Sequence, residues 1–157
     1  ILACDVAKHM SALAAQYNLP PELMRIEITE TAYTGESEAV DKLTADLHNQ
    51  GFSTYMDDFG TGQSTLAMLK NVNVDVIKLD RTFLPDGKTD NRSSQIVSSM
   101  LEMAQSLHLP VVVEGIETNE QAQLLRQMGA RYAQGFLYYR PMQAKDFEAL
   151  LDGGNNN

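Results

Sequence analysis

The chain has 157 residues, of which 43% are hydrophobic, and a net charge of −9 at pH 7, which predicts a single globular domain. Such an acidic chain does not suit the binding of long nucleic acid, which needs a basic surface. No apolar run is long enough for a membrane helix. The single cysteine, Cys4, excludes an internal disulfide framework and fits a reducing compartment such as the cytoplasm.

Helical and strand patterns alternate along the chain. The helical segments place apolar residues three or four positions apart, and the strand segments are short, apolar and bounded by turn residues. One helix followed by five β-α pairs is typical of an α/β protein with a parallel sheet, here one domain over 1–152 with a frayed or engineered tail at 153–157. The expected strands are 23–29, 52–56, 74–80, 110–115 and 131–138. Four expected helices are 1–17, 63–70, 96–107 and 146–151. Two more helices are expected, one that carries Val40, Leu43 and Leu47 and one that follows a capping box at 118–121.

A charged or amide side chain stands at or near the end of every expected strand. Ligands of parallel α/β sheets bind at the carboxyl ends of the strands. Burying these groups separately would cost several kcal/mol each unless they were paired or bound to metal. We therefore expect them to share one site. They are Glu27, Asp57 with Asp58, Lys78 with Asp80, Glu114, and Gln134.

The pair Asp57-Asp58, followed by the turn Gly60-Thr61-Gly62, is the most informative local feature. Adjacent carboxylates repel each other unless a cation lies between them, and aspartate oxygens suit Mg²⁺ or Mn²⁺. Together with Glu27, the pair has the donors for one or two divalent ions. A solvated turn with a helix cap is the alternative interpretation.

The other strand-end residues have two interpretations each. Lys78 suits a phosphate oxygen or a water whose pKa it would lower, or it is a counter-ion for Asp57 or Asp80. Glu114 can bind metal or act as a general base. Gln134 can donate to a phosphate or orient water, or it is a buried amide bonded to the backbone.

Five motifs, in the order of the family and between Leu23 and Pro141, resemble the EAL domain family of bacterial phosphodiesterases that linearise cyclic di-GMP. The resemblance implies a (β/α)₈ TIM-like barrel of which this chain holds only the C-terminal five or so β/α units. It also implies a two-metal site for Mg²⁺ or Mn²⁺. The motifs are Glu27-Ile28-Thr29-Glu30, Asp57-Asp58-Phe59-Gly60-Thr61-Gly62, Ile77-Lys78-Leu79-Asp80, Val113-Glu114-Gly115-Ile116-Glu117-Thr118, and Gln134-Gly135-Phe136 with Arg140-Pro141.

The resemblance also assigns roles, motif by motif. Glu27, Asp57 and Asp58 become metal ligands. Lys78 contacts the attacking water, Glu114 is linked to the metal or acts as general base, and Gln134 lies beside the water or the phosphate. Glu30 steadies the loop after Asp58, which contains Thr61 and Gly62, and Glu117 is its counterpart after Glu114.

The chain also departs from the family. The Glu-Ala-Leu signature, whose Glu is a metal ligand, and an Asn ligand on an earlier strand are absent, so about the first third of the domain is missing. Because an unclosed barrel has open strand edges, we expect a homodimer, a swapped oligomer or pairing with the missing segment, and little or no hydrolysis by this chain alone. The resemblance implies a parent protein with sensor or GGDEF domains, which a membrane anchor can accompany. A non-catalytic cyclic di-GMP receptor or a protein-interaction module is the alternative function.

Overall fold

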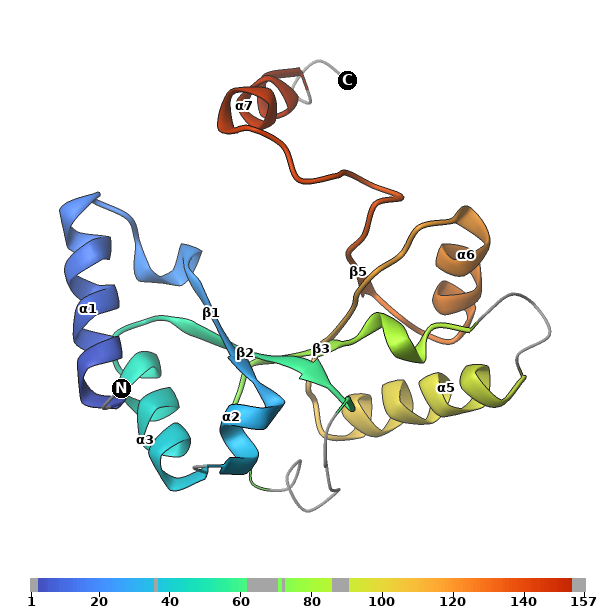
Figure 1. Ribbon diagram of the computed structural model, residues 1–157, viewed down its shortest axis with the longest axis horizontal. Coiled ribbons are helices and arrows are strands. Elements are labelled where there is room, and N and C mark those ends of the chain that lie inside the picture. The colour runs from blue at the N-terminus through green and yellow to red at the C-terminus, as the bar shows by residue number, and fades with distance from the viewer. Residues whose placement is uncertain (1–2, 36, 62–70, 72, 86–90, 154–157) are drawn as a thin grey trace.

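The computed structural model describes residues 3–35, 37–61, 71, 73–85 and 91–153. The expected helix at 63–70, Gly62 and the tail residues 154–157 lie outside these ranges. The described part contains a sheet of five strands in the order β1-β2-β3-β4-β5, and every neighbouring pair is parallel. The prediction of an α/β protein with a parallel sheet is confirmed (Figure 1).

In chain order, β1, β4 and β5 are each followed by a helix and β3 by a short 3-10 turn and then a helix, while most of the segment between β2 and β3 lies outside the described ranges. The strands are β1 (Arg25–Thr29), β2 (Ser53–Phe59), β3 (Val76–Leu79), β4 (Val111–Val113) and β5 (Tyr132–Ala133). The helices are α1 (Ala3–Gln16), α2 (Glu30–Gly35), α3 (Ser37–His48), α5 (Asn91–Ser106), α6 (Asn119–Gln127) and α7 (Ala144–Gly153), with 3-10 turns η1 (Pro21–Leu23) and η2 (Arg81–Phe83).

The last strand is shorter than the sequence indicates. The expected strand at 131–138 is wrong beyond Ala133, because the chain turns away after Gln134 and folds over the loop that follows β4. The amide of Ile116 donates to the Gln134 carbonyl, and the Leu137 amide donates to the Ile116 carbonyl. A Cβ at Gly135 would lie 2.1 Å from the Ile116 carbonyl oxygen, so only glycine permits this close approach.

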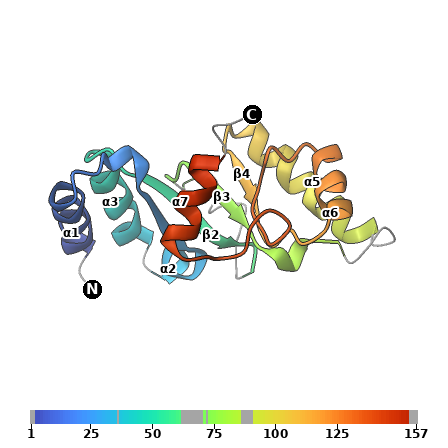
Figure 2. The same ribbon diagram turned by 90° about the horizontal axis from the view of Figure 1, so that it is seen from above.

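One face of the sheet packs under helices and forms the main core. The alternation of the strands places Ile28, Met56, Ile77 and Val113 on this face, each at most 7% exposed. Figure 2 shows α1 and α3 near one end of the sheet and α5 and α6 near the other. The expected packing role of Met100 and Met103 is confirmed, since both lie against this core. Burial of each large apolar side chain contributes about 1.5–3 kcal/mol.

The predicted capping box at the start of α6 is confirmed. Thr118 accepts a hydrogen bond from the Gln121 amide, and the Gln121 side chain accepts one from the Thr118 amide. This pair fixes where the loop after β4 ends and α6 begins.

The opposite face of the sheet carries polar residues and is open. Residues 27, 55, 57 and 78 alternate with the core positions, so their side chains project from this face. Within the described ranges, β1 and β5 each pair with a single neighbour, and α7 stands apart from the other helices (Figure 1). None of the helices in the described ranges combines the length and hydropathy that a membrane crossing needs.

Candidate active site

A bulge in β2 sets the direction of the two aspartates. Met56 pairs with Ile77 and Phe59 pairs with Leu79, so β2 uses one residue more than β3 between these pairs. Asp58 absorbs that residue with a left-handed φ of 55°. In a regular strand Asp58 would follow Met56 into the core. The bulge instead returns Phe59 to the core at 5% exposed and leaves Asp58 exposed beside Asp57.

Lys78 lies at the centre of the polar face. Its side chain is 7% exposed, and its Nζ lies 2.8 Å from Glu27 Oε1, 2.8 Å from Asp57 Oδ1 and 3.0 Å from Glu114 Oε1. The ammonium therefore connects β1, β2 and the end of β4. The sequence left Asp57 or Asp80 as its counter-ion. The structure selects Asp57, and within the described ranges no ion pair joins Lys78 to Asp80.

Glu27 reaches this cluster from inside its strand. Thr29, at the end of β1, is in register with Asp57, and Glu27 lies two residues earlier, opposite Tyr55. Residues two apart on a strand share a face, so Glu27 projects on the same side as Asp57. The longer glutamate side chain spans the remaining distance to Lys78 and stays 48% exposed.

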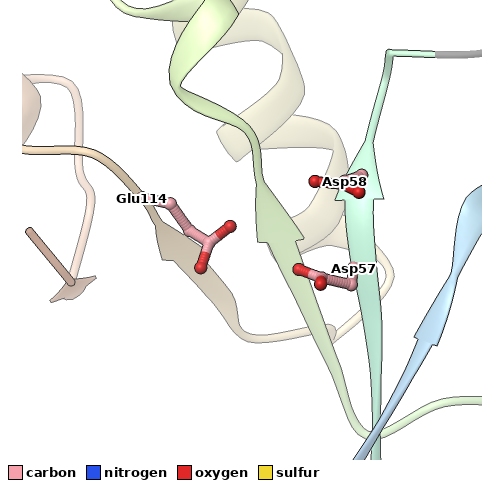
Figure 3. Close-up of side chains that lie close together, drawn as sticks. All are labelled: Asp57, Asp58 and Glu114. Atoms are coloured by element: carbon pink, nitrogen blue, oxygen red, sulfur yellow. The ribbon is translucent and has the colours of Figure 1, made fainter. Parts of the chain in front are cut away.

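Three carboxylates converge beside the lysine. Asp57, Asp58 and Glu114 each offer an oxygen, and these oxygens lie within 4.8 Å of one another. Figure 3 shows the Glu114 side chain pointing across β3 toward the two aspartates. Three carboxylates pair with the Lys78 ammonium and Asp58 adds a fourth beside two of them, which leaves an excess of negative charge. Because carboxylate oxygens are the ligands that Mg²⁺ and Mn²⁺ prefer, this donor set fits a divalent cation.

The cluster changes the proton affinities of its members. Burial disfavours the charged form of Lys78, but hydrogen bonds to Asp57, Glu27 and Glu114 outweigh it and raise the pKa of the lysine. Burial also raises the pKa of Glu114; Lys78 opposes this rise, and the charges of Asp57 and Glu27 add to it. At neutral pH the lysine is therefore a fixed cation, and the site makes protonation of Glu114 easier than for a free glutamate.

The turn after β2 is held by a buried glutamate. Glu30, the first residue of α2, is 1% exposed and its Oε2 accepts a 2.8 Å hydrogen bond from the Gly60 amide. Thr61 donates from both its amide and its hydroxyl to the Asp58 carbonyl, at 3.2 and 2.9 Å. Gly62, which the sequence places in the same loop, lies outside the described ranges. The loop thus starts from a fixed point directly after the aspartates.

A hollow of about 240 Å³ lies beside the cluster at the carboxyl ends of β3, β4 and β5. Glu114, Glu117 and Gln134 line it. Gln134 is exposed and not a buried amide, and its backbone carries the link to Val113 and Ile116. The Glu117 side chain is exposed, and only its amide is hydrogen-bonded in the described ranges, to Gln121. The structure thus brings the two residues to the site's edge.

Two further residues of the hollow follow β3. Asp80 caps η2, accepting a 2.9 Å hydrogen bond from the Thr82 amide. Burial opposes its charge, but hydrogen bonds from Thr82 and Arg81 lower the pKa of Asp80. Arg81 packs closely on Gly115. A Cβ added at Gly115 would lie 2.4 Å from the Cβ of Arg81. Arg81 is not among the residues predicted from the sequence, although it directly follows the strand-end acid Asp80 and lines the hollow.

An acid-rich site at the carboxyl ends of parallel strands defines an α/β domain of the barrel type that is suited to binding divalent cations. The family described as "EAL domain" matches residues 5–141, and the chain belongs to that family.

Comparisons with individual proteins agree. The chain is 39% identical over 148 residues to the cyclic di-GMP phosphodiesterase RocR of Pseudomonas aeruginosa. The aligned region covers 94% of this chain and 38% of RocR. The crystal structure of the EAL domain of Mycobacterium smegmatis DcpA superposes with a TM-score of 0.87 at 32% identity, covering 94% of this chain and 66% of that one. A manganese and cyclic di-GMP complex of Klebsiella pneumoniae BlrP1 superposes with a TM-score of 0.79 at 32% identity. The superposition covers 85% of this chain and 34% of the BlrP1 chain.

These coverages define how much of the architecture is present. The chain spans well under half the length of RocR and of the Bacillus subtilis signaling protein YkoW, 38% and 17% respectively. The solved neighbours are EAL domains with a TIM-like barrel, and the five strands of this chain form part of that barrel.

Proposed function

We propose that this segment supplies part of the active site of a cyclic di-GMP phosphodiesterase that releases linear pGpG. The observation that carries the proposal is the convergence of Glu27, Asp57 and Glu114 on Lys78 at the carboxyl ends of the strands. Support comes from relatives named cyclic di-GMP phosphodiesterases, among them RocR, and from neighbours solved with cyclic di-GMP.

The proposed site holds Mg²⁺ or Mn²⁺ through Glu27, Asp57 and Asp58, with two ions as the finer proposal. The grouping of Asp57, Asp58 and Glu114 oxygens within 4.8 Å supports a cation site, and the BlrP1 complexes contain manganese or calcium. A divalent cation bound there supplies Lewis acidity toward a phosphodiester. Glu27 also offers a carboxylate, and its ion pair with Lys78 holds it beside the three grouped carboxylates.

The chain's own side chains have the following proposed roles in the reaction. Lys78, a fixed cation, holds the attacking water or a phosphate oxygen by hydrogen bonding. Glu114 accepts a proton from that water, a role that its position beside Lys78 and its raised pKa both support. Gln134 donates to a phosphate oxygen from the rim of the hollow.

The remaining proposed residues support the loops and do not contact the reacting atoms. Glu30 fixes the turn at Gly60, which keeps Asp58 and Thr61 in place. Gly62 belongs to the same proposed loop. Glu117 is proposed to do the same for the loop after Glu114.

The test is hydrolysis of cyclic di-GMP by the full-length protein that carries this segment, with Mg²⁺ or Mn²⁺. Turnover to pGpG is expected, and Asp57→Asn should reduce kcat at least a hundredfold, while Asp46→Asn on α3 should leave it unchanged. Binding of cyclic di-GMP without turnover would instead identify a receptor.

For the 157-residue chain alone we expect little or no hydrolysis, because the polar face of the sheet is open and the Glu27 side chain is 48% exposed.

We also propose that the chain self-associates. Within the described ranges, β1 and β5 each pair with a single neighbouring strand, and open strand edges favour pairing with a further chain. The expected state is a homodimer or a swapped oligomer, which size-exclusion chromatography with light scattering measures. A parent protein with sensor or GGDEF domains in the cytoplasm stays a prediction.

A further inference from the structure

The short turn η2 directly follows β3, the strand that separates the two parts of the acidic site. Figure 3 shows Asp57 and Asp58 of β2 on one side of β3 and Glu114 on the other. β3 ends at Leu79 and η2 begins at Arg81, so the chain turns into η2 as soon as it leaves the sheet between these carboxylates. From this place η2 reaches both the loop after β2 and the loop after β4.

Phe83 of η2 supports the loop after β2. Its ring lies so close to Gly60 that a Cβ added to this glycine would be 2.6 Å from both Cε2 and Cζ of the ring. Gly60 comes two residues after Asp58 and has a left-handed φ of 93°. Phe83 also packs against the main core, so its ring is a fixed surface on which the turn after the aspartates rests.

Arg81 of η2 supports the loop after β4 in the same way. A Cβ added at Gly115 would lie 2.4 Å from the Cβ of Arg81, 3.3 Å from its Cγ and 3.2 Å from its Cδ. These atoms all belong to the aliphatic stem, so the contact is made by the stem and not by the guanidinium. Gly115 directly follows Glu114, whose amide donates to the Leu79 carbonyl at 3.0 Å. The stem of Arg81 thus limits where the backbone of Glu114 can lie.

The turn η2 is itself closed by hydrogen bonds. Asp80 accepts a 2.9 Å bond from the Thr82 amide, and the Leu84 amide donates to the Arg81 carbonyl at 2.9 Å. Arg81 and Phe83 therefore belong to one closed turn, and neither moves far without the other.

We propose that η2 is a spacer that sets the distance between Glu114 and the two aspartates, so that Arg81 and Phe83 are positioning residues for the cation site. Each acts through the glycine that it contacts. The oxygens of the three carboxylates lie within 4.8 Å of one another, and they share a cation only while this spacing is kept. A shift of either loop therefore weakens cation binding. This inference rests on the proposed cation site and names what holds its two parts together.

Calorimetric titration of Mn²⁺ into the full-length protein that carries this segment tests the role of Phe83 without cyclic di-GMP. Phe83→Ala should weaken Mn²⁺ binding about tenfold, as removal of groups that orient metal ligands does. Phe83→Leu keeps much of the apolar volume and should restore most of the affinity. Met103→Ala is the matched control, because Met103 is also half-buried and packs against the same core. It should lose stability without a change in Mn²⁺ affinity.

Two variants of Arg81 separate positioning from an effect of charge. Arg81→Met keeps an unbranched stem beside Gly115 and should bind Mn²⁺ about as tightly as wild type, whereas Arg81→Ala should bind about tenfold more weakly. Arg126→Ala removes an exposed arginine on α6 and should leave the affinity unchanged. Equal changes in Arg81→Met and Arg81→Ala would assign the effect to the charge and overturn the role of the stem.

Hydrogen exchange shows whether η2 couples the two loops. Phe83→Ala should speed up amide exchange at residues 114–116, and Arg81→Ala should speed it up at residues 60–61, in each case on the far side of η2. Faster exchange only in the loop that each residue contacts would mean two separate supports and would overturn the spacer.

The remaining outcomes distinguish this inference from the proposed function. Wild-type Mn²⁺ affinity in both Phe83→Ala and Arg81→Ala would overturn the spacer alone. Mn²⁺ binding that is weakened as expected, in a protein that does not hydrolyse cyclic di-GMP, would overturn the proposed phosphodiesterase and support the spacer. A full-length protein that binds no Mn²⁺ would overturn both.

Discussion

The Gly60 amide donates to the buried carboxylate of Glu30 at 2.8 Å, and this bond links the start of α2 to the turn after β2. Glu30 is 1% exposed, so the bond is shielded from water. The turn that follows Asp57 and Asp58 is thereby fixed to a helix that begins directly after β1. Loss of this bond is expected to loosen the turn before it affects the sheet.

Glu30→Ala removes the acceptor of the Gly60 amide. Leaving a buried donor without its partner costs about 1–3 kcal/mol, and the turn should open more often. Urea unfolding measures the first effect, and amide hydrogen exchange at Gly60 and Thr61 measures the second. Glu30→Gln keeps an acceptor at the same place and should cost less. Equal exchange rates at Gly60 in wild type and Glu30→Ala would show that the bond does not hold the turn.

Gly60→Ala should destabilise the protein more than Gly129→Ala. Both glycines have left-handed φ values, 93° and 95°, so alanine introduces backbone strain of about 1 kcal/mol at either site. A Cβ at Gly60 would lie 2.6 Å from the Phe83 ring, whereas one at Gly129 meets nothing within 4 Å. The clash should bring the cost of Gly60→Ala to about 2–4 kcal/mol. Thermal unfolding of the two variants provides the comparison, and similar losses would mean that Phe83 moves aside easily.

The sheet and the composition of the site could be predicted because they follow from local patterns. The run Val111-Val112-Val113 indicates a buried strand wherever it occurs, and β4 lies there. Strand-end residues of a parallel sheet meet at one edge. That rule alone brings Asp57, Lys78 and Glu114 together.

What the sequence did not predict depends on contacts between distant segments. The bulge at Asp58 needs β3 as a register partner, and the early end of β5 depends on Gly135 approaching the Ile116 backbone. Neither contact leaves a periodic signal. The bond between Lys78 and Glu27 was also missed, because Glu27 lies two residues before the strand end and reaches the site only through its side-chain length.

Lys78→Met should destabilise the protein at pH 7 and less so in acid. The variant leaves three carboxylates without their shared cation, at a cost on the order of 1–3 kcal/mol given their partial exposure. The pKa of Lys78 is raised, so its contribution is complete at neutral pH and is lost only as pH rises through that raised value. As pH falls, Glu114, whose pKa is raised, takes up a proton, and the repulsion within the cluster decreases.

Urea unfolding of Lys78→Met between pH 4 and pH 8 measures this dependence. Lys42→Met, which removes an exposed lysine on α3, controls for the loss of one positive charge. Equal destabilisation by Lys78→Met at both ends of the pH range would argue against electrostatic repulsion as its cause.

Divalent cations should stabilise the chain through the carboxylate cluster. A ligand at a hundred times its dissociation constant adds about 2.7 kcal/mol to the folded state, so Mg²⁺ or Mn²⁺ should raise the thermal midpoint and a chelator should reverse the change. Asp58→Asn replaces one of the three grouped carboxylates by a neutral amide and should raise the cation concentration needed for this response at least tenfold. Asp46→Asn should respond as wild type does. A midpoint that rises equally in all three proteins would place the cations elsewhere.

Tyr33 should give the protein a distinct alkaline limit. Its hydroxyl donates to Asp41 Oδ1 at 3.0 Å and its side chain is 4% exposed. Burial, followed by the hydrogen bond and the charge of Asp41, raises the pKa of Tyr33 to about 12. The fold thus favours the neutral phenol. The stability that this preference contributes is complete below the pKa of the unfolded chain, about 10, and is lost as pH rises from there to about 12.

Tyr33→Phe should cost about 1 kcal/mol at pH 7 and should lose less stability than wild type between pH 9 and pH 12. Tyr17→Phe, at an exposed position, should follow the wild-type curve, and parallel curves for wild type and Tyr33→Phe would exclude this buried phenol as the titrating group.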